Sequence, residues 1–289
     1  VWYNTTSNTV KANYINPGSW ATVNSMNTAR YSLGSAGTQT SALGFGGAAP
    51  ADSALTELWN GTNWTAVNAL NTAQIRDGTG ASNTAALAFG GNSALTETWN
   101  GTNWTEVNNL NVLRYGLGTS GTNTAALGFG GDGPAITAIT ESWNGTNWTE
   151  VNDLNTARRY LAGAGTQTSA LGFGGNAGVG GTNATELWNG TNWTAVNNLN
   201  TSRQSPAGAG ATNTAALAFG GNLPPVTTAT ESWNGTNWTT LNSMNTAREG
   251  LGGAGTNTVA LAFGGTVPPV TTATEAWNAG PATVTFDVS

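Results

Sequence analysis

The chain has 289 residues, of which 38% are hydrophobic and only 8% are charged, and its formal net charge is −6. It contains no cysteine and no histidine, which excludes disulfides, thiolate nucleophiles, and the commonest metal ligand and general base. The acidic balance argues against nucleic acid as a partner, and no apolar run approaches the roughly 18 residues of a membrane span. We therefore expect no cofactor, no metal, no membrane insertion, and an uncharged Asn/Thr/Ser/Gly surface typical of a virion or an extracellular protein.

The first 26 residues differ from the rest of the chain. The segment VWYNTTSNTVKANYINPGSWATV resembles the short aromatic hairpin modules of bacteriophage tail fibres. That resemblance implies a virion setting, with other virion proteins as neighbours. The matching positions are Trp2, Tyr3, Asn4, Thr5, Thr6, Tyr14, Gly18, Ser19 and Trp20.

From Trp20 onward the sequence repeats itself. Phe-Gly-Gly occurs six times at spacings of 40 to 46 residues. A period of about 40–50 residues favours a four-stranded propeller blade over a helical repeat. Within one unit, strands are expected at 160–165, 168–175, 185–190 and 192–197, and the Gly- and Thr-rich composition carries no helix signal. The small residues of the first strand suit the crowded axis of a propeller.

The phrase WNGTNW occurs five times. Its Asn-Gly pair favours a tight hairpin, since both residues tolerate positive φ. We expect the first Trp to pack between neighbouring sheets and the second to brace the outer strand, with sugar stacking as the alternative role. These residues are Trp59, Trp64, Trp99, Trp104, Trp143, Trp148, Trp188, Trp193, Trp233 and Trp238.

The few charged residues also recur with the repeat. A Glu stands two residues before the first Trp of each unit, and an Arg stands ten residues after the second, except that unit two has Gln74 there and its arginine at Arg76. We predict one partly buried, bidentate Arg–Glu pair per blade junction, with a ring of metal-binding carboxylates as the alternative. The residues are Arg30, Arg114, Arg158, Arg203 and Arg248, with Glu57, Glu97, Glu141, Glu186, Glu231 and Glu275.

The order of Gly-Gly, an aromatic residue, Trp and a loop ending in Arg resembles the kelch repeat over about residues 20–278. Near-identical units with LNTAR and GTQTSALGFGG are also similar to kelch arrays in bacteriophage structural proteins. The resemblance implies a β-propeller and no particular activity. Galactose oxidase, a kelch-type enzyme, needs histidines and a Tyr–Cys crosslink, so its activity is excluded by composition.

We therefore expect an all-β, six-bladed kelch-type β-propeller of four-stranded antiparallel blades, forming a single domain overall. Residues 1–26 would be a fibre-like hairpin and closing strand, and residues 27–289 the propeller. The strand around Trp20 would complete the sheet built from residues 249–278, leaving ATVTFDVS outside. Alternatively, ATVTFDVS completes that sheet and residues 1–26 begin a seventh blade.

The loops after Gly-Gly are where the repeat stops copying itself, and they should share one face with the NLNTAR loops. Variable loops on a rigid scaffold are typical of recognition sites, although neutral spacers would look the same. The candidate binding residues are Asp52, Asp132, Pro134, Leu223, Pro224, Pro225, Pro268 and Pro269.

The sequence favours a non-enzymatic virion module, such as a tail-fibre, spike or decoration propeller, that binds a host-surface receptor or glycan and is a homo-oligomer within the virion. A secreted carbohydrate-binding propeller is the alternative. A glycosidase with paired carboxylates is a third hypothesis, but its candidates stand singly on different units. They are Asp77, Glu106, Glu150, Asp153 and Glu249. Asn-x-Ser/Thr triplets at Asn60, Asn63, Asn100 and Asn103 read as glycosylation acceptors or as a by-product of the hairpin phrase.

Overall fold

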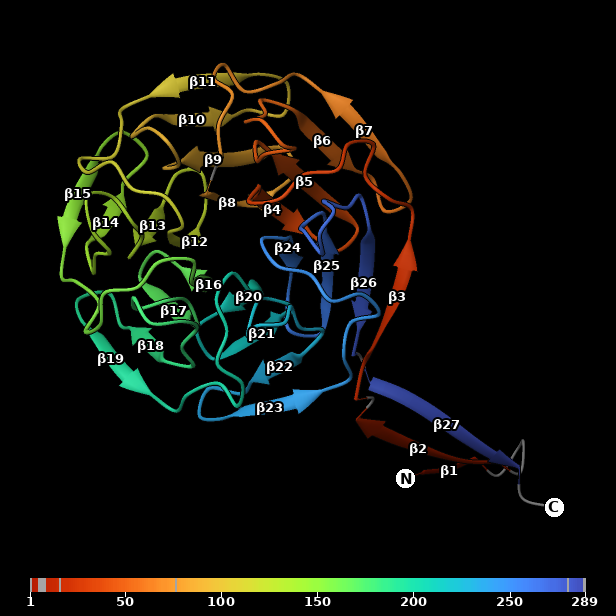
Figure 1. Ribbon diagram of the computed structural model, residues 1–289. Coiled ribbons are helices and arrows are strands. Elements are labelled where there is room, and N and C mark those ends of the chain that lie inside the picture. The colour runs from red at the N-terminus through yellow and green to blue at the C-terminus, as the bar shows by residue number, and fades with distance from the viewer. Residues whose placement is uncertain (1, 5–8, 16, 76, 280, 288–289) are drawn as a thin grey trace.

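A computed structural model describes residues 2–4, 9–15, 17–75, 77–279 and 281–287, with the backbone alone for 2–4, 9–15, 81 and 281–287. Thr5, Thr6 and Arg76, named above, lie outside the described residues. Six four-stranded antiparallel sheets are arranged around a central axis, as Figure 1 shows. The expected all-β, six-bladed propeller is therefore confirmed, and the described part of the chain contains no helix.

Each blade runs from an inner strand at the axis to an outer strand at the rim (Figure 1). Blade one consists of β4 (Gly34–Thr38), β5 (Ser41–Phe45), β6 (Thr56–Trp59) and β7 (Trp64–Val67); blade two of β8 (Asp77–Ser82), β9 (Ala85–Phe89), β10 (Thr96–Trp99) and β11 (Trp104–Val107); and blade three of β12 (Gly118–Gly121), β13 (Ala126–Phe129), β14 (Thr140–Trp143) and β15 (Trp148–Val151). Blade four consists of β16 (Ala162–Thr166), β17 (Ser169–Phe173), β18 (Thr185–Trp188) and β19 (Trp193–Val196); blade five of β20 (Ala207–Thr212), β21 (Ala215–Phe219), β22 (Thr230–Trp233) and β23 (Trp238–Leu241); and blade six of β24 (Gly252–Gly255), β25 (Val259–Phe263), β26 (Thr274–Asn278) and β3 (Ser19–Val23).

The four strands expected in the Arg158 unit are all present, but the first begins later than predicted. Tyr160 lies outside β16 because its φ is 53°, in the left-handed region. The strand forms only from Ala162, where the chain becomes extended. The residue type at position 160 gives no warning of this, since tyrosine disfavours positive φ.

The ring closes through the N-terminal strand β3. It pairs antiparallel with β26, and Trp20 lies opposite Trp277. This is the closure expected from the sequence, and the seven-bladed alternative is wrong. The remaining strands, β1 (Trp2–Asn4), β2 (Thr9–Ile15) and β27 (Pro281–Asp287), form a separate three-stranded sheet in the order β1-β2-β27. That sheet lies outside the ring and contains both ends of the chain (Figure 1).

The WNGTNW phrase forms the turn between the third and outer strands. Trp59 and Trp64 lie directly opposite each other, so four residues make the turn. Asn60 Oδ1 accepts hydrogen bonds from the backbone N–H groups of Thr62 and Asn63 at 2.9 and 2.8 Å. Only the glycine, Gly61 with φ 92°, is left-handed. The phrase thus encodes an asparagine-stabilised turn in which Asn60 itself keeps a negative φ, unlike the residues of a two-residue hairpin.

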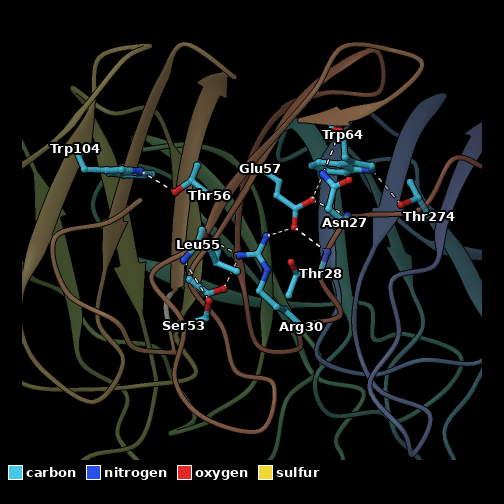
Figure 2. Close-up of polar contacts among 11 residues, drawn as sticks. Asn27, Thr28, Arg30, Ser53, Leu55, Thr56, Glu57, Trp64, Trp104 and Thr274 are labelled. Carbon is cyan, nitrogen blue, oxygen red and sulfur yellow. Dashed lines mark hydrogen bonds and ion pairs between the residues drawn. The ribbon is translucent and has the colours of Figure 1, made fainter. Parts of the chain in front are cut away.

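The two tryptophans of a turn both contribute to the packing between blades, and the second one crosses to the neighbour. The Trp104 ring lies 4.9 Å from Phe45 of blade one, and its indole N–H donates to Thr56 Oγ1 at 3.0 Å (Figure 2). Trp99 instead donates within its own blade, to Asn83 O. The expected division of roles was therefore incomplete, because the outer-strand tryptophan both braces its strand and joins two blades.

This Trp–Thr–Phe contact recurs at all six junctions, including the one that closes the ring. Trp20 donates to Thr230 Oγ1 at 3.0 Å and packs 5.0 Å from Phe219. The other four junctions use Trp64 with Thr274 and Phe263, Trp148 with Thr96 and Phe89, Trp193 with Thr140 and Phe129, and Trp238 with Thr185 and Phe173.

Replacing the threonine acceptor tests this contact. Thr140→Val keeps the side-chain shape but leaves the buried indole N–H of Trp193 without its partner, 3.1 Å away in the native protein. We expect a loss of about 1–3 kcal/mol in the free energy of unfolding, measured by denaturant titration. Thr149→Val, on the exposed face of β15, is the control and should change stability by less than about 0.5 kcal/mol. Equal effects at the two positions would contradict the assignment.

The innermost strands explain why the sequence uses such small residues there. A Cβ added at Gly163 would lie 2.2 Å from the carbonyl oxygen of Thr119 on the preceding blade. In blades one and three, the same position carries a hydroxyl that donates to the strand of the preceding blade, as Thr119 Oγ1 does to Gly78 O at 3.1 Å. The position therefore accepts either no side chain or a short donor.

Candidate functional site

The repeated Arg and Glu form latches that hold the connection between two blades. Arg30 Nη2 donates to Glu57 Oε1 at 3.0 Å, and Arg30 Nη1 donates to the carbonyl oxygens of Gly46 and Leu55 (Figure 2). Glu57 Oε2 accepts from the backbone and side-chain N–H groups of Asn27, at 2.7 and 2.9 Å. The predicted pairing is confirmed, but the guanidinium divides its donors between one carboxylate oxygen and the backbone, so the expected bidentate geometry is wrong.

These pairs are more buried than predicted. The side chains of Arg30 and Glu57 are 0% and 2% exposed. Burial lowers the pKa of the Arg30 guanidinium from its ordinary value, and the neighbouring Glu57 carboxylate partly offsets that shift. The same pairs, with the same cause of the lowered arginine pKa, are Arg114–Glu141, Arg158–Glu186, Arg203–Glu231 and Arg248–Glu275. Their partners are protein groups inside the ring, so we assign them a structural role.

Blade two departs from this pattern, as the sequence indicated. Gln74 occupies the arginine position, is 2% exposed, and accepts a hydrogen bond from Ser93 Oγ at 2.8 Å. Glu97 still accepts from Asn71 N and Nδ2, both at 2.8 Å.

The two faces of the disc differ in what they present. One face carries the WNGTNW turns and the turns between first and second strands. These turns are tied together by bonds such as Asn68 Nδ2 to Thr102 O at 2.9 Å. The other face carries the loops after Gly-Gly and the connections between blades, which are joined by short bridges such as Tyr115 with Asp132. We call this second side the loop face.

The structure places the predicted binding residues on the loop face, and it exposes all but one of them. Asp132 is 6% exposed and takes part in contacts described below. Leu223 is 41% exposed. The other exposed members of the set are Asp52, Pro134, Pro224, Pro225, Pro268 and Pro269.

The loop face also holds most of the exposed large apolar side chains of the described chain. Val179, in the Gly-rich loop of blade four, is fully exposed. Leu55, Leu113 and Leu223 are each more than 40% exposed and lie in loops of the same face. Single exposed apolar side chains of this kind are common on protein surfaces and do not by themselves indicate a partner.

A hydrogen-bonded ring of backbone surrounds the axis at the loop face. The residue two positions after the repeated Arg has a positive φ, and its N–H donates to the carbonyl of the equivalent residue in the preceding blade. Four such links lie between described residues: Ser32 to Gly250, Gly250 to Ser205, Ser205 to Tyr160, and Tyr160 to Gly116. Their N···O distances are 2.7 to 3.1 Å. This collar fixes the width of the channel mouth.

The collar leads into a cavity along the axis. The mouth has a volume of about 100 Å³ and is lined by residues such as Tyr160, Ser205 and Asp77. The channel beyond it has a volume of about 380 Å³ and is lined by the inner strands of all six blades. Because those strands present mainly Gly, Ala, Ser and Thr, the channel walls are uncharged apart from Asp77.

A cluster of polar and aromatic side chains lies beside this mouth, between blades three and four. Tyr115 OH donates to Asp132 Oδ2 at 3.0 Å, and Arg159 forms an ion pair with the same carboxylate oxygen. The Arg159 guanidinium lies 5.2 Å from the centre of the Tyr160 ring, which in turn lies 6.0 Å from the ring of Tyr115. The hydrogen bond and charge of Asp132 raise the pKa of Arg159, and burial raises the pKa of Tyr160, so Arg159 is cationic and Tyr160 a neutral hydroxyl donor at neutral pH.

At the equivalent position, the next two blade junctions have one pair of uncharged side chains and one pair in which a single side chain is charged. Asn176 Nδ2 donates to Gln204 Oε1 at 2.6 Å, and Asn222 Nδ2 donates to Glu249 Oε1 at 3.0 Å. Arg159, Gln204 and Glu249, which directly follow the repeated Arg, thus each contact the loop of the preceding blade, whereas Tyr115 contacts the loop of its own blade.

The lone carboxylates lie in different surroundings. Asp77 lines the channel and accepts from Leu117 N at 3.1 Å, and Asp153 accepts from Thr140 N at 3.0 Å. Glu106 and Glu150 are exposed on outer strands. Among the described residues, no three His, Cys, Asp or Glu side chains come together as a metal site would require. Nor does any helix there have the length and apolar character needed to cross a bilayer.

Comparison with known proteins gives the fold. The chain matches no family model and no curated relative. Among solved structures it is similar to YjhT, with a TM-score of 0.69 and 14% sequence identity over 86% of this chain and 95% of that one. The likeness is one of fold. YjhT therefore supports the propeller architecture and carries no conclusion about activity.

Asp132 was the only member of this cluster among the predicted binding residues, and Tyr160 was expected to begin the innermost strand. The two residues after the repeated Arg, positions 31 and 32 in blade one, form a different pair in each of the five units that have this Arg. This variation was the available signal, since the positions on either side barely change.

Proposed function

We propose that this protein is a non-enzymatic recognition module of a virion, such as a tail-fibre, spike or decoration propeller, that attaches to a host-surface receptor or glycan through its loop face. The proposal rests on the observation that the sequence differences between blades lie on one face of the propeller. The loops after Gly-Gly differ in length or sequence, and the two residues after the repeated Arg form a different pair in each unit that has this Arg, whereas the turns of the opposite face are nearly identical. A rigid scaffold that varies on one face is suited to binding.

The position of the sheet β1-β2-β27 supports this orientation. This sheet lies outside the ring (Figure 1). A propeller held at its rim through such a sheet keeps the loop face free for a partner. The resemblance of residues 1–26 to tail-fibre hairpins and of the blades to kelch arrays supports a virion setting, with other virion proteins as neighbours and several copies per particle.

A secreted carbohydrate-binding propeller is the second candidate. The channel mouth, with its tyrosines and polar pairs, favours it. It shares the binding face of the first candidate and differs in being free in solution.

Attachment can be tested with fluorescently labelled protein and a panel of bacterial isolates, scored by flow cytometry. We expect labelling of at least one isolate. A loop-levelled variant, in which residues 176–184, 222–229 and 266–273 are each replaced by the Asn92–Leu95 sequence of blade two, should lose that labelling by about tenfold or more, the cost of a few lost contacts. Blade two shows that this short connection fits the ring.

The matched control changes the opposite face. Thr146→Ala and Thr191→Ala alter exposed turn residues there and should leave labelling unchanged. Melting temperatures verify that each variant is folded. Labelling that survives loop levelling, that is lost in the turn variants, or that occurs with no isolate would contradict the proposal.

A further inference from the structure

The cluster of Tyr115, Asp132, Arg159 and Tyr160 has a feature that the fold itself does not require. The collar position adopts a positive φ in every described blade, and four of the five described residues there are Gly or Ser. Blade four places a tyrosine in this conformation. Left-handed φ costs a bulky residue roughly 1–2 kcal/mol, and such strain tends to persist at binding sites.

The other four blades with a described residue at this position act as internal controls. Ser32, Ser205, Gly116 and Gly250 make the same collar links as Tyr160, so the tyrosine side chain adds nothing to the collar. Its ring lies over Gly116, where an added Cβ would approach Tyr160 Cδ1 to 2.6 Å, and it remains half-buried at the mouth. The glycine of blade three thus leaves room for the tyrosine ring of blade four, which lies beside the channel.

The charges of the cluster indicate the class of ligand. Arg159 and Asp132 neutralise each other, and the carboxylate of Asp77 lines the same mouth, so the site has no excess positive charge with which to select an anion. It offers a hydroxyl from Tyr160, the guanidinium of Arg159, whose side chain is 30% exposed and whose buried Nε has no hydrogen-bond partner, and a tyrosine ring. An apolar face bordered by fixed donors and acceptors suits an uncharged polyhydroxyl ring.

We infer that the mouth of the channel binds a neutral saccharide, one sugar ring lying against Tyr160 with its hydroxyls bonded to Arg159 and Asp132. This inference rests on the proposed recognition function and names its ligand. The chain of the saccharide leads outward over the loop face, where the variable loops contact it.

Saturation-transfer NMR and calorimetric titration with maltose, cellobiose, lactose and mannobiose test the inference, with digalacturonic acid as the acidic comparison. We expect at least one neutral disaccharide to bind, with an affinity that does not change between low and high NaCl because the ligand carries no charge. Preference for the acidic disaccharide with binding that weakens in salt, or no binding of any neutral one, would overturn it.

The variants introduce residues that other blades carry at the equivalent positions. Tyr160→Ser copies blades one and five, and Arg159→Gln copies Gln204 of blade five. Each should weaken binding at least about tenfold. Tyr160→Ser should leave the melting temperature unchanged or raised, since strain is removed. Tyr31→Gln, which changes the residue after the Arg of blade one, is the control and should stay within about twofold.

The outcomes separate this inference from the proposed function. If no neutral saccharide binds but the intact protein still labels cells and the loop-levelled variant does not, the saccharide assignment fails and the attachment role stands. If loop levelling has no effect on labelling, the attachment role fails. A loss of saccharide binding in Tyr31→Gln equal to that in Tyr160→Ser would place the sugar elsewhere and overturn the inference.

Discussion

Arg30→Gln should lower the free energy of unfolding by about 3–5 kcal/mol, because removing one partner of a buried ion pair leaves an uncompensated charge. Glu57 is 2% exposed, and it would keep only the hydrogen bonds from Asn27 and Thr28. The carbonyl oxygens of Gly46 and Leu55 would also lose their donor. Denaturant titration measures the loss.

Two further variants sharpen this test. Arg159→Gln removes an arginine whose side chain is 30% exposed, so its ion pair should contribute no more than about 1 kcal/mol. Arg30→Met combined with Glu57→Met should not restore stability, although buried pairs often tolerate such replacement, because the backbone partners of both side chains would remain unsatisfied. Full recovery in the double variant would show that the latch is a simple ion pair and that its backbone bonds are dispensable.

Trp20→Ala should destabilise the protein by about 3–5 kcal/mol and also open the ring locally. Trp20 makes the same contacts as Trp104: an indole hydrogen bond of 3.0 Å to a threonine of the preceding blade and a phenylalanine ring about 5 Å away. The two residues differ in chain connectivity. β11 is joined to β10 by a short turn, whereas β3 reaches β26 only through strand pairing.

Hydrogen exchange measured by mass spectrometry distinguishes the two sites. In Trp20→Ala, the amides of β26 should exchange faster than the amides of the other third strands, since β3 can detach without unfolding its neighbours. In Trp104→Ala, which is the matched control, β10 should keep its protection relative to the other blades. Equal loss of protection at β26 and β10 would show that closure adds nothing beyond the contacts of the tryptophan.

The repeat made most of the fold predictable. Six copies of Phe-Gly-Gly at nearly constant spacing determine six blades, and the missing outer strand of the last unit matches the sequence around Trp20. The Arg–Glu pairing was also predictable, because both residues recur in register and few other charges exist. In each case the information lies within one unit or in its copy number.

Contacts between units were harder to predict. The bond from Trp104 to Thr56 joins residues 48 positions apart, and nothing in one unit says which face meets the next blade. The bidentate geometry expected of the arginines failed for a related reason, since the competing carbonyls of Gly46 and Leu55 come from loops whose path depends on the whole blade. The left-handed conformation at Tyr160 is imposed by the collar and runs against the preference of the residue.

The buried arginines have a consequence for proteolysis. Trypsin cleaves after Lys and Arg, and the chain has only eight such residues, of which Arg30, Arg114, Arg158, Arg203 and Arg248 are fully buried. A protease must bind an extended stretch of chain, so these five bonds become cleavable only when a blade comes apart. The rate of tryptic digestion after those arginines therefore reports how often a blade unfolds locally. The same burial protects the propeller from trypsin-like proteases.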